Sequence, residues 1–261
     1  MKKKFAEVKH LFNGKPDESI GLTDETLMEV EWVEPQTLLT PYRLDLPIKI
    51  KYIETHEKGW NTKFFTDMYD AHIRAFSSGT YTEPDKPEKN SIEKYFKVFH
   101  ELIEEIKNHG LDENISLIPV TKNNIITNGS HRTSCAIYFN KKVPVVRFPD
   151  NFPEQNILAN SFFFRERGME YDYVDYATSE LFKMLNRKNF HVAILWSRAD
   201  LNKIPQAEKI LFEETELVYA KTFQADFKYG LISIEMCKNY FFIWIKNSTS
   251  QNNLPKFRRD E

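Results

Sequence analysis

The clearest alternation of apolar and polar positions lies near the amino end of the chain. In the sequence LMEVEWV, Met28, Val30 and Trp32 alternate with two glutamates. A period of two is typical of a half-buried β-strand, because successive side chains point to opposite faces of a sheet. The pattern therefore predicts a strand, which Glu34 and Pro35 end.

A period near 3.6 marks the next clear element, SIEKYFKVFHELIEEIKNHG. Ser91 stands where an N-cap is expected and Gly110 where a C-cap is expected, so the segment between them is predicted to be a helix. The apolar positions that share one stripe of this helix are Ile92, Tyr95, Phe96, Phe99, Leu102, Ile103 and Ile106.

Two segments between these elements carry weaker patterns. The sequence PYRLDLPIKIKYIE alternates charged and apolar residues, which predicts a second extended segment broken at Pro47. Residues 64–76 predict a short helix, and the Gly-, Pro- and Lys-rich stretch after it predicts a loop. Such a loop can act as a lid or be a solvated connection, and the sequence leaves both open.

The middle of the chain changes to short strands. ISLIPV predicts a strand, Asn123-Asn124 a turn, Ile125-Ile126 a return strand and Asn128-Gly129 a second turn. HRTSCAIYFN then predicts a helix, and VPVVRF another strand. The predicted unit is hairpin, turn, helix, strand.

Beyond residue 150 the pattern alternates again. YATSELFKMLNRKN and PQAEKILFEE predict helices, and HVAILW and ELVYAKTF predict strands. Alternating strands and helices favour an α/β layer. We therefore expect an α+β or α/β fold with three parts: a loose polar arm over 1–25, a domain over 26–150, and an α/β extension or second domain over 151–261.

Composition narrows the possible partners. The chain has 261 residues, 41% of them apolar, which is enough for a real core. Its 36 basic and 38 acidic residues leave a formal charge of -2, so no global basic field attracts nucleic acid or membrane, and an anion site must be local. The low cysteine usage, Cys135 and Cys237 alone, favours a reducing compartment. With no signal peptide and no bilayer-length apolar run, we expect a cytoplasmic protein.

The turn NGSHRTS carries the main candidate chemistry. A glycine turn followed by the first turn of a helix presents backbone N–H groups that lack intrahelical partners, and the helix dipole favours negative charge there. An arginine fork can clamp phosphate oxygens, and a histidine can donate a hydrogen bond or move a proton. The candidate anion-binding residues are Gly129, Ser130, His131, Arg132, Thr133 and Ser134. The alternative is that Ser130 only caps the helix, with His131 and Arg132 solvated.

The order of these elements resembles a known superfamily. IPV, a short hairpin, IITNGSHRTSCAIYF and VPVV resemble the ParB/sulfiredoxin-like superfamily, whose members carry a G-x-H-R segment at the start of a helix after such a hairpin. The closest likeness is to ParB-like proteins of bacterial surface-polysaccharide loci. The resemblance covers about residues 27–148. It implies a ParB/sulfiredoxin-like core in which Gly129, Ser130, His131 and Arg132 bind nucleotide phosphates.

Departures from the family pattern restrict the activity that this resemblance implies. Sulfiredoxins place a reactive cysteine where this chain has Ser130, and a hydroxyl cannot supply a thiolate nucleophile. Nothing after residue 150 resembles the helix-turn-helix domain of chromosome-partitioning ParB proteins. The free-serine kinases of the superfamily transfer phosphate from a nucleotide to a small hydroxyl compound with the help of an acidic residue. That branch implies a kinase that uses ATP or ADP.

Such a transfer needs a base or orienting group and cations for the developing charge. We expect Asp45 to be the catalytic carboxylate, kept ionised by neighbouring cations. His131 is the other catalytic candidate, and Glu34 is the reserve carboxylate. The expected substrate-binding residues are Arg43, Lys49, Lys51 and His72. The alternatives are an exposed strand with paired charges and a core histidine at position 72.

Further cations are weaker candidates. Lys86 and Lys89 could close over phosphates or be solvated. The loose candidates for anionic groups in the second half are Arg165, Arg167, Arg198 and Lys203.

No metal-ligand motif stands out in the sequence, so no protein-bound metal is expected, and Mg²⁺ would be held largely by substrate phosphates. We expect a nucleotide and a small hydroxyl acceptor as partners, the acceptor being a sugar or other polyhydroxy compound. Two alternatives stay open: a nucleotide-binding regulator without turnover, and a ParB-like nucleic-acid binder or nuclease.

Overall fold

The structure is a computed structural model that describes residues 1–12, 22–60, 63–82, 89–149 and 159–185, and, further on, residue 206 and the backbone of the strands between 190 and 246. The chain divides into two units, Met1–Leu185 and Asn186–Glu261, and each is described by itself. The domain boundary expected near residue 150 lies inside the first unit.

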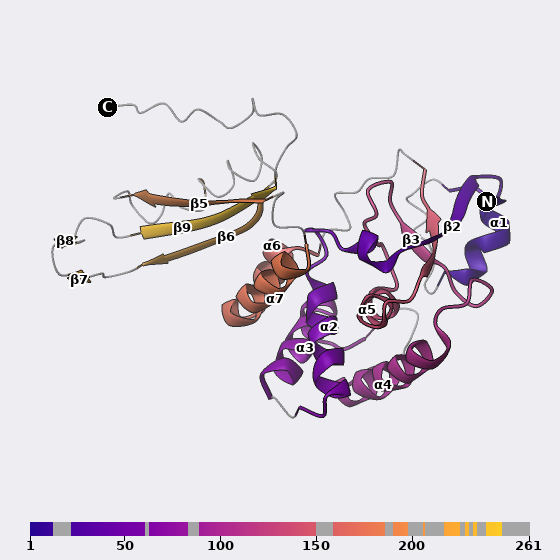
Figure 1. Cartoon of the computed structure of the whole chain (residues 1–261), viewed down its shortest axis with the longest axis horizontal. Helices are drawn as coiled ribbons and strands as arrows, with labels where there is room; N and C mark the ends of the chain where they lie inside the picture. The colour runs from indigo at the N-terminus through magenta and orange to yellow at the C-terminus, as the bar shows by residue number, and fades with distance from the viewer. Residues whose placement is uncertain are drawn as a thin grey trace. The chain divides into compact units, whose positions relative to one another are not determined.

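A mixed four-stranded sheet organises the first unit (Figure 1). Its strands are β1 (Lys2–Lys4), β2 (Leu27–Val33), β3 (Ile118–Val120) and β4 (Val143–Arg147). They lie in the order β1-β2-β4-β3; β2 is antiparallel to β1 and to β4, whereas β3 runs parallel to β4. The three strands predicted at LMEVEWV, ISLIPV and VPVVRF are confirmed. The expected return strand is reduced to a single bridge between Val120 and Ile126.

Residues 1–12 cover one face of this sheet. They form β1, the short helix α1 (Phe5–Val8) and a 3-10 turn at Lys9–Leu11. Phe5, Val8 and Leu11 recur every third residue and are buried against the sheet. The prediction of a loose arm is therefore wrong for these residues, because their apolar stripe and the pairing of β1 with β2 fix them.

The opposite face of the sheet packs against α5 (Ser130–Phe139) and α2 (Asp45–Glu57). The helix predicted at HRTSCAIYFN is thus confirmed. The extended segment predicted at PYRLDLPIKIKYIE is wrong, because residues 45–57 are helical. Pro47 is the third helical residue, and a proline is tolerated in the first turn, where its missing N–H has no intrahelical partner. The helix is buried on almost every side, so it lacks the one-sided pattern of a surface helix.

Two further helices extend this layer, α3 (Lys63–Phe76) and α4 (Ile92–His109). Both were predicted, and α4 begins after Ser91 and ends before Gly110 as expected. Aromatic rings fill the space between α2, α3 and α4; Tyr69 stacks on Tyr52 with 4.6 Å between ring centroids, and on Phe99 with 5.4 Å.

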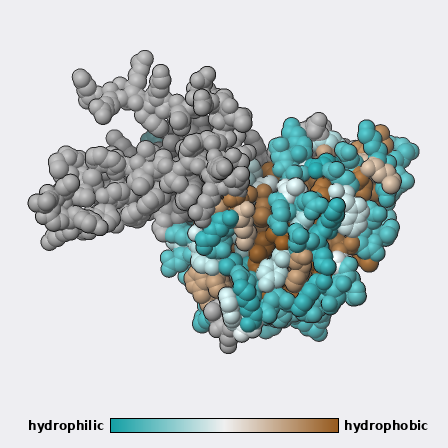
Figure 2. Space-filling model, viewed as in Figure 1, coloured by the Kyte–Doolittle hydropathy of each residue, from teal (hydrophilic) through white to brown (hydrophobic). Residues whose placement is uncertain are grey.

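The first unit ends with α6 (Ser161–Glu166) and α7 (Tyr171–Met184). Helix α7 confirms the prediction from YATSELFKMLNRKN as far as Met184. A backbone hydrogen bond connects the residues just before α6 to the start of α2, because the Leu44 amide donates to the Ala159 carbonyl at 2.8 Å. In Figure 2, hydrophilic residues cover most of the visible surface of the first unit, with hydrophobic side chains between them.

The described strands of the second unit are antiparallel. Here β5 (Phe190–Ser197) and β6 (Leu217–Gln224) both pair with β9 (Asn239–Lys246), which lies between them. A separate pair is formed by β7 (Lys228–Tyr229) and β8 (Ile232–Ser233). The two predicted strands are confirmed, but their antiparallel pairing differs from the parallel arrangement typical of α/β layers. The helix predicted at PQAEKILFEE lies outside the described residues, apart from Gln206. The chain as described is therefore mixed α+β.

None of the helices that the structure describes is long and apolar enough to span a membrane.

Candidate anion-binding site

A cavity of about 590 Å³ lies where α2, α3, α4 and the turn before α5 meet. Its polar lining is mainly basic on the side of α2 and α5. Its basic and imidazole side chains are those of Arg43, Lys49, His72, Lys89, His131 and Arg132. The sequence motif NGSHRTS at residues 128–134 and the cluster in PYRLDLPIKIK at residues 41–51, which are far apart in the chain, therefore meet at one site.

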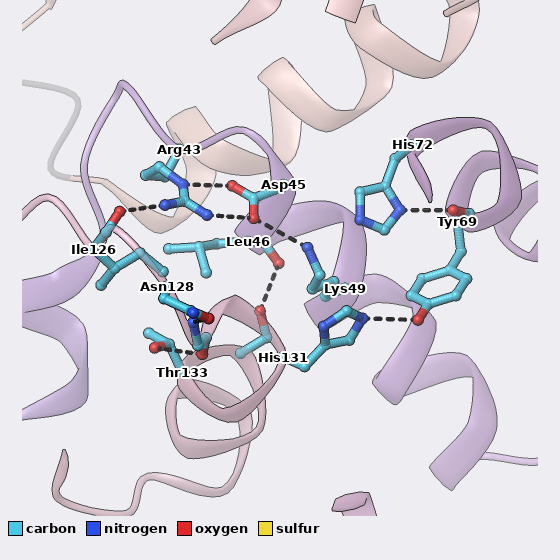
Figure 3. Close-up of polar contacts among 12 residues, drawn as sticks. Arg43, Asp45, Leu46, Lys49, Tyr69, His72, Ile126, Asn128, His131 and Thr133 are labelled. Atoms are coloured by element: carbon cyan, nitrogen blue, oxygen red, sulfur yellow. Dashed lines mark hydrogen bonds and ion pairs between the residues drawn. The ribbon is translucent and has the colours of Figure 1, made fainter. Parts of the chain in front are cut away.

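Arg43, Asp45 and Lys49 form a buried ionic cluster (Figure 3). The Arg43 guanidinium donates to both carboxylate oxygens of Asp45 at 2.8 Å, and the Lys49 ammonium donates to Oδ2 at 3.0 Å. Helix α2 places Lys49 one turn after Asp45, at the i,i+4 spacing that favours such a pair. Arg43 also donates to the Ile126 carbonyl, which ties the cluster to the segment before α5.

Asp45 is held as a permanent anion by this cluster. Its complete burial would raise its pKa, but the charges and hydrogen bonds of Arg43 and Lys49 hold the pKa well below the usual value of 3.8. Asp45 does not line the cavity, and both of its oxygens are already bonded. A carboxylate in this state is a poor base, so the expected role of Asp45 as catalytic base does not fit its position. It orients Arg43 and Lys49, which do line the cavity.

The Gly129 turn brings α5 against the cavity. Gly129 has φ of +81°, in the left-handed region that other residues rarely adopt. A Cβ atom at this position would lie 2.5 Å from Ile118 Cδ1 and 2.7 Å from Arg132 Nη2. The glycine is therefore needed both for the turn and for the close approach of the arginine. Gly129, Ser130, His131 and Arg132 all line the cavity.

Arg132 has an unused donor. Its side chain is only 8% exposed, and among the described residues its Nη1 atom has no hydrogen-bond partner. Burial lowers its pKa to about 10, so it still carries a positive charge at neutral pH. A buried donor without a partner costs about 1–3 kcal/mol, more when charged. An anion in the cavity would satisfy this guanidinium.

Two histidines face the same space from different helices. His131 on α5 has its Nε2 2.8 Å from the hydroxyl of Tyr69, and its ring meets Phe99 edge-on at 4.6 Å between centroids. His72 on α3 is completely buried and lines the cavity. Burial, followed by the Lys49 charge, lowers the pKa of each ring well below 6.5. Both imidazoles are therefore neutral at pH 7.

The charge of the site is positive overall. Arg43, Lys49, Lys89 and Arg132 are buried cations that line the cavity, and Asp45 offsets only one of them. Lys89 lies over the Tyr95 ring, with its ammonium 5.0 Å from the centroid. The carboxylates in the wall are Glu101 and Glu105, on the exposed side of α4. Because these four cations are buried, their charges act more strongly on an anion than they would on the surface.

Other expected site residues have structural roles. Thr133 donates to the Gly129 carbonyl at 3.1 Å, and Ser134 donates to the Leu46 carbonyl at 3.4 Å; both are fully buried, and neither lines the cavity. Lys51 lies away from the cavity, where it pairs with Glu54 at 2.7 Å and Glu180 at 3.3 Å. The expected roles of these three residues in ligand binding therefore do not fit their positions.

Of the weaker candidates that the structure describes, Lys89 lines the cavity, whereas Glu34, Arg165 and Arg167 do not. Glu34 is exposed and pairs with Lys142 at 3.2 Å. Arg165 donates to the Tyr171 hydroxyl at 2.8 Å, and Arg167 lies over the Phe163 ring. Lys86, Arg198 and Lys203 lie outside the described residues.

Sequence reasoning missed several lining residues. Tyr95, Phe99 and Leu102 were assigned to the core because they lie on the apolar stripe of α4, yet they also line the cavity. Glu101 and Glu105 are one turn apart on the same helix, a spacing that places them on one face. This spacing is the one feature of the sequence that could have indicated a shared role for the two glutamates, but the same spacing is common on solvent-exposed helices.

One group of metal-ligating side chains lies elsewhere. His56 and Glu57 at the end of α2 and Glu104 on α4 have ligand atoms within 4.8 Å of one another. Lys107 already pairs with Glu57 at 2.8 Å and reaches Glu104 at 3.8 Å, so an ammonium supplies positive charge to this group. That the protein binds no metal of its own stays a prediction.

Comparison with known proteins adds no assignment: no protein-family model matches the chain, and no curated protein or solved structure is significantly similar to it.

Proposed function

We propose that this protein is a nucleotide-dependent phosphotransferase acting on a small hydroxyl compound. The phosphate chain of ATP or ADP would lie against the Gly129–Arg132 turn and the Arg43 and Lys49 cations. The observation that carries this proposal is the buried Nη1 of Arg132, which lacks a partner among the described residues in a cavity with excess positive charge. Such a cavity favours a polyanion, and phosphoryl transfer depends mainly on positioning and on charge stabilisation.

Different walls would hold the parts of the ligand. Tyr95, Phe99 and Leu102 offer apolar surface for a base or sugar ring. Glu101 and Glu105 supply the carboxylate oxygens that suit Mg²⁺, which would otherwise be held by the phosphates themselves. Bound Mg²⁺ supplies charge neutralisation for the phosphates. A sugar or polyhydroxy acceptor is the part of the proposal that rests on the likeness to proteins of polysaccharide loci.

The ParB/sulfiredoxin-like assignment belongs to this proposal. In its support, the strand β3, the Asn128-Gly129 turn, helix α5 and strand β4 follow one another as the resemblance implies, with β3 and β4 parallel neighbours in the sheet. The His-Arg pair opens the helix at the cavity.

A nucleotide-binding regulator without turnover is the second candidate. The observation in its favour is the state of Asp45, whose carboxylate is fully paired and outside the cavity. Nucleic-acid binding is less favoured, because the cations that line the cavity are buried, whereas a duplex or single strand is bound by exposed basic surfaces.

The test is a binding titration of ATP, ADP and inorganic phosphate with and without Mg²⁺, followed by an assay of phosphate transfer to a panel of sugars and polyols. Arg132→Ala removes the unpaired donor, and the matched control is Lys97→Ala, an exposed cation of α4 that does not line the cavity. Hydrogen bonds to charged groups contribute about 1.5–3 kcal/mol, so Arg132→Ala should weaken nucleotide binding about 10- to 100-fold.

The outcomes separate the candidates. Equal nucleotide affinity for Arg132→Ala and Lys97→Ala would contradict the placement of the phosphates. Nucleotide binding without any transfer to the acceptors would favour the regulator. Binding with release of the terminal phosphate onto an acceptor would establish the kinase.

A further inference from the structure

His72 has one ring nitrogen whose role is fixed and one that is free. Its Nδ1 lies 2.6 Å from the backbone carbonyl of Tyr69, one turn earlier in α3. A carbonyl can only accept, so Nδ1 must carry the hydrogen and donate it. Because the ring is neutral, Nε2 has a lone pair and no hydrogen. Within the part of the chain that the structure describes, this buried Nε2 has no hydrogen-bond partner.

The surroundings of His72 keep it unprotonated. Burial opposes protonation of the ring most strongly, followed by the charge of Lys49 on α2, and Arg43 adds to this effect. Asp45 and the hydrogen bond to the Tyr69 carbonyl favour protonation but do not outweigh it. In Figure 3 the ring lies on the far side of Lys49 from Asp45. Its other contacts are with rings: Tyr69, Phe76 and His131 at 5.0, 5.9 and 6.5 Å, and Phe164 of α6 at 6.4 Å between centroids. Nε2 is thus a preformed hydrogen-bond acceptor beside the Lys49 cation.

His131 does not offer the same group. Its Nε2 is already engaged with the Tyr69 hydroxyl at 2.8 Å. Two residues that line the cavity therefore carry a buried polar atom without a partner among the described residues: the cationic donor Nη1 of Arg132 and the neutral acceptor Nε2 of His72. A ligand that satisfies both must bring an anionic oxygen and, separately, an O–H or N–H donor.

We propose that His72 binds the acceptor hydroxyl and takes its proton during phosphate transfer. This inference rests on the proposed function and replaces Asp45 as the base. The hydroxyl oxygen forms a bond to the terminal phosphorus, and the bond from that phosphorus to its bridging oxygen breaks. The electron pair of that bond leaves with the shortened nucleotide, and the hydroxyl proton moves to Nε2. In a loose transition state the main task of the base is to orient the hydroxyl, so a weakly basic histidine is adequate.

The wall around His72 indicates the class of acceptor. Ile73 and Phe76 supply apolar surface, and Ser77 and Thr82 supply hydroxyl groups, all lining the cavity. A polyhydroxy compound has apolar C–H faces and several O–H groups, so it matches such a mixed wall. We therefore place a compact polyol or sugar against α3, with the nucleotide phosphates toward α5.

The test compares His72→Asn with His72→Gln and the wild type. Asparagine keeps a donor near the position of Nδ1, for the Tyr69 carbonyl, but has no basic nitrogen at Nε2; glutamine is the second substitution of similar size. Nucleotide affinity is measured by titration calorimetry, and kcat/KM for polyol acceptors by phosphate transfer. A base contributes on the order of 10²–10⁴-fold, so kcat/KM should fall by that amount while nucleotide affinity stays within about threefold.

The results separate this inference from the proposed function. If the wild type transfers phosphate and both His72 variants transfer it equally well, the role of His72 is overturned and the phosphotransferase stands. If the wild type binds no nucleotide, both fail. Nucleotide affinity also serves as the folding control: a His72 variant that binds nucleotide within about threefold of the wild type is folded at the site. Unchanged kcat/KM in such a variant would overturn the assignment.

Discussion

The substitution Asp45→Asn tests whether the buried ionic cluster holds the site together. The change is nearly isosteric but removes the negative charge that faces Arg43 and Lys49. All three side chains are almost completely buried, so two cations would be left in the interior without their counterion. Breaking a buried pair in this way costs about 3–5 kcal/mol.

This magnitude converts into a measurable melting shift. For a unit of this size each kcal/mol changes Tm by about 2–4 °C, so Asp45→Asn should lower Tm by about 6–20 °C. Circular dichroism melts of the full chain measure it. The matched control is Asp67→Asn, which removes the partner of Lys63 in an exposed pair of α3 and should leave Tm nearly unchanged.

The effect of phosphate on Tm provides a second, independent measurement. The Asp45→Asn variant has one more uncompensated positive charge beside the cavity, so inorganic phosphate should raise its Tm more than that of the wild type. A combined Arg43→Met, Asp45→Leu, Lys49→Met variant should be more stable than Asp45→Asn, because it leaves no buried charge in the cluster. A Tm within about 2 °C of the wild type for Asp45→Asn would refute the reasoning.

Three further predictions follow from the site. Because the pKa values of His72 and His131 are lowered in the fold, the unfolded chain binds protons first, so stability is complete above about pH 6.5 and falls below it by up to about 1.4 kcal/mol per pH unit for each histidine. Urea unfolding at pH 5.5 and 7.5 measures the loss, and an unchanged free energy would contradict it. Gly129→Ala should cost about 1–3 kcal/mol in backbone strain and weaken phosphate binding, as melts and titrations would show; unchanged binding would mean that Arg132 reaches its place without the glycine. Lys51→Ala should leave nucleotide affinity unchanged, because the Lys51 ammonium pairs with glutamates away from the cavity. A tenfold loss of affinity, measured by titration, would show that Lys51 contributes to binding.

The elements that the sequence predicted well bury one face and expose the other. Helix α4 has an apolar stripe between Ser91 and Gly110, and β2 buries Met28 and Val30 as its alternation predicts, so local pattern and tertiary burial agree there. Trp32, on the same stripe of β2, is exposed instead. Helix α2 was missed because burial surrounds it, and its polar residues Asp45 and Lys49 are as buried as its isoleucines. Charged residues inside a helix interrupt the pattern on which such predictions depend.

The sequence identified several residues that lie at the cavity, but it did not predict what each of them does there. The motif placed Gly129 and Arg132 at the cavity, which local turn and helix chemistry could indicate. The sequence predicted that neighbouring cations keep Asp45 ionised, and Arg43 and Lys49 do so. It did not predict that Asp45 is buried and fully paired, because the i,i+4 pairing with Lys49 exists only in a helix, whereas the segment had been interpreted as a strand. The free nitrogen of His72 depends on a carbonyl one turn earlier in α3, a contact that no motif marks.

The two edges of the four-stranded sheet bear on self-association. An open edge strand presents unpaired backbone groups that can recruit a strand from another molecule, and lysines on such a strand discourage this pairing. The edge strand β1 consists of three lysines, Lys2 to Lys4. At the other edge β3 is only three residues long, and the return of the chain at Ile126 bridges back to Val120. Both edges are thus protected, so we expect concentrated solutions of this unit to resist sheet-mediated aggregation.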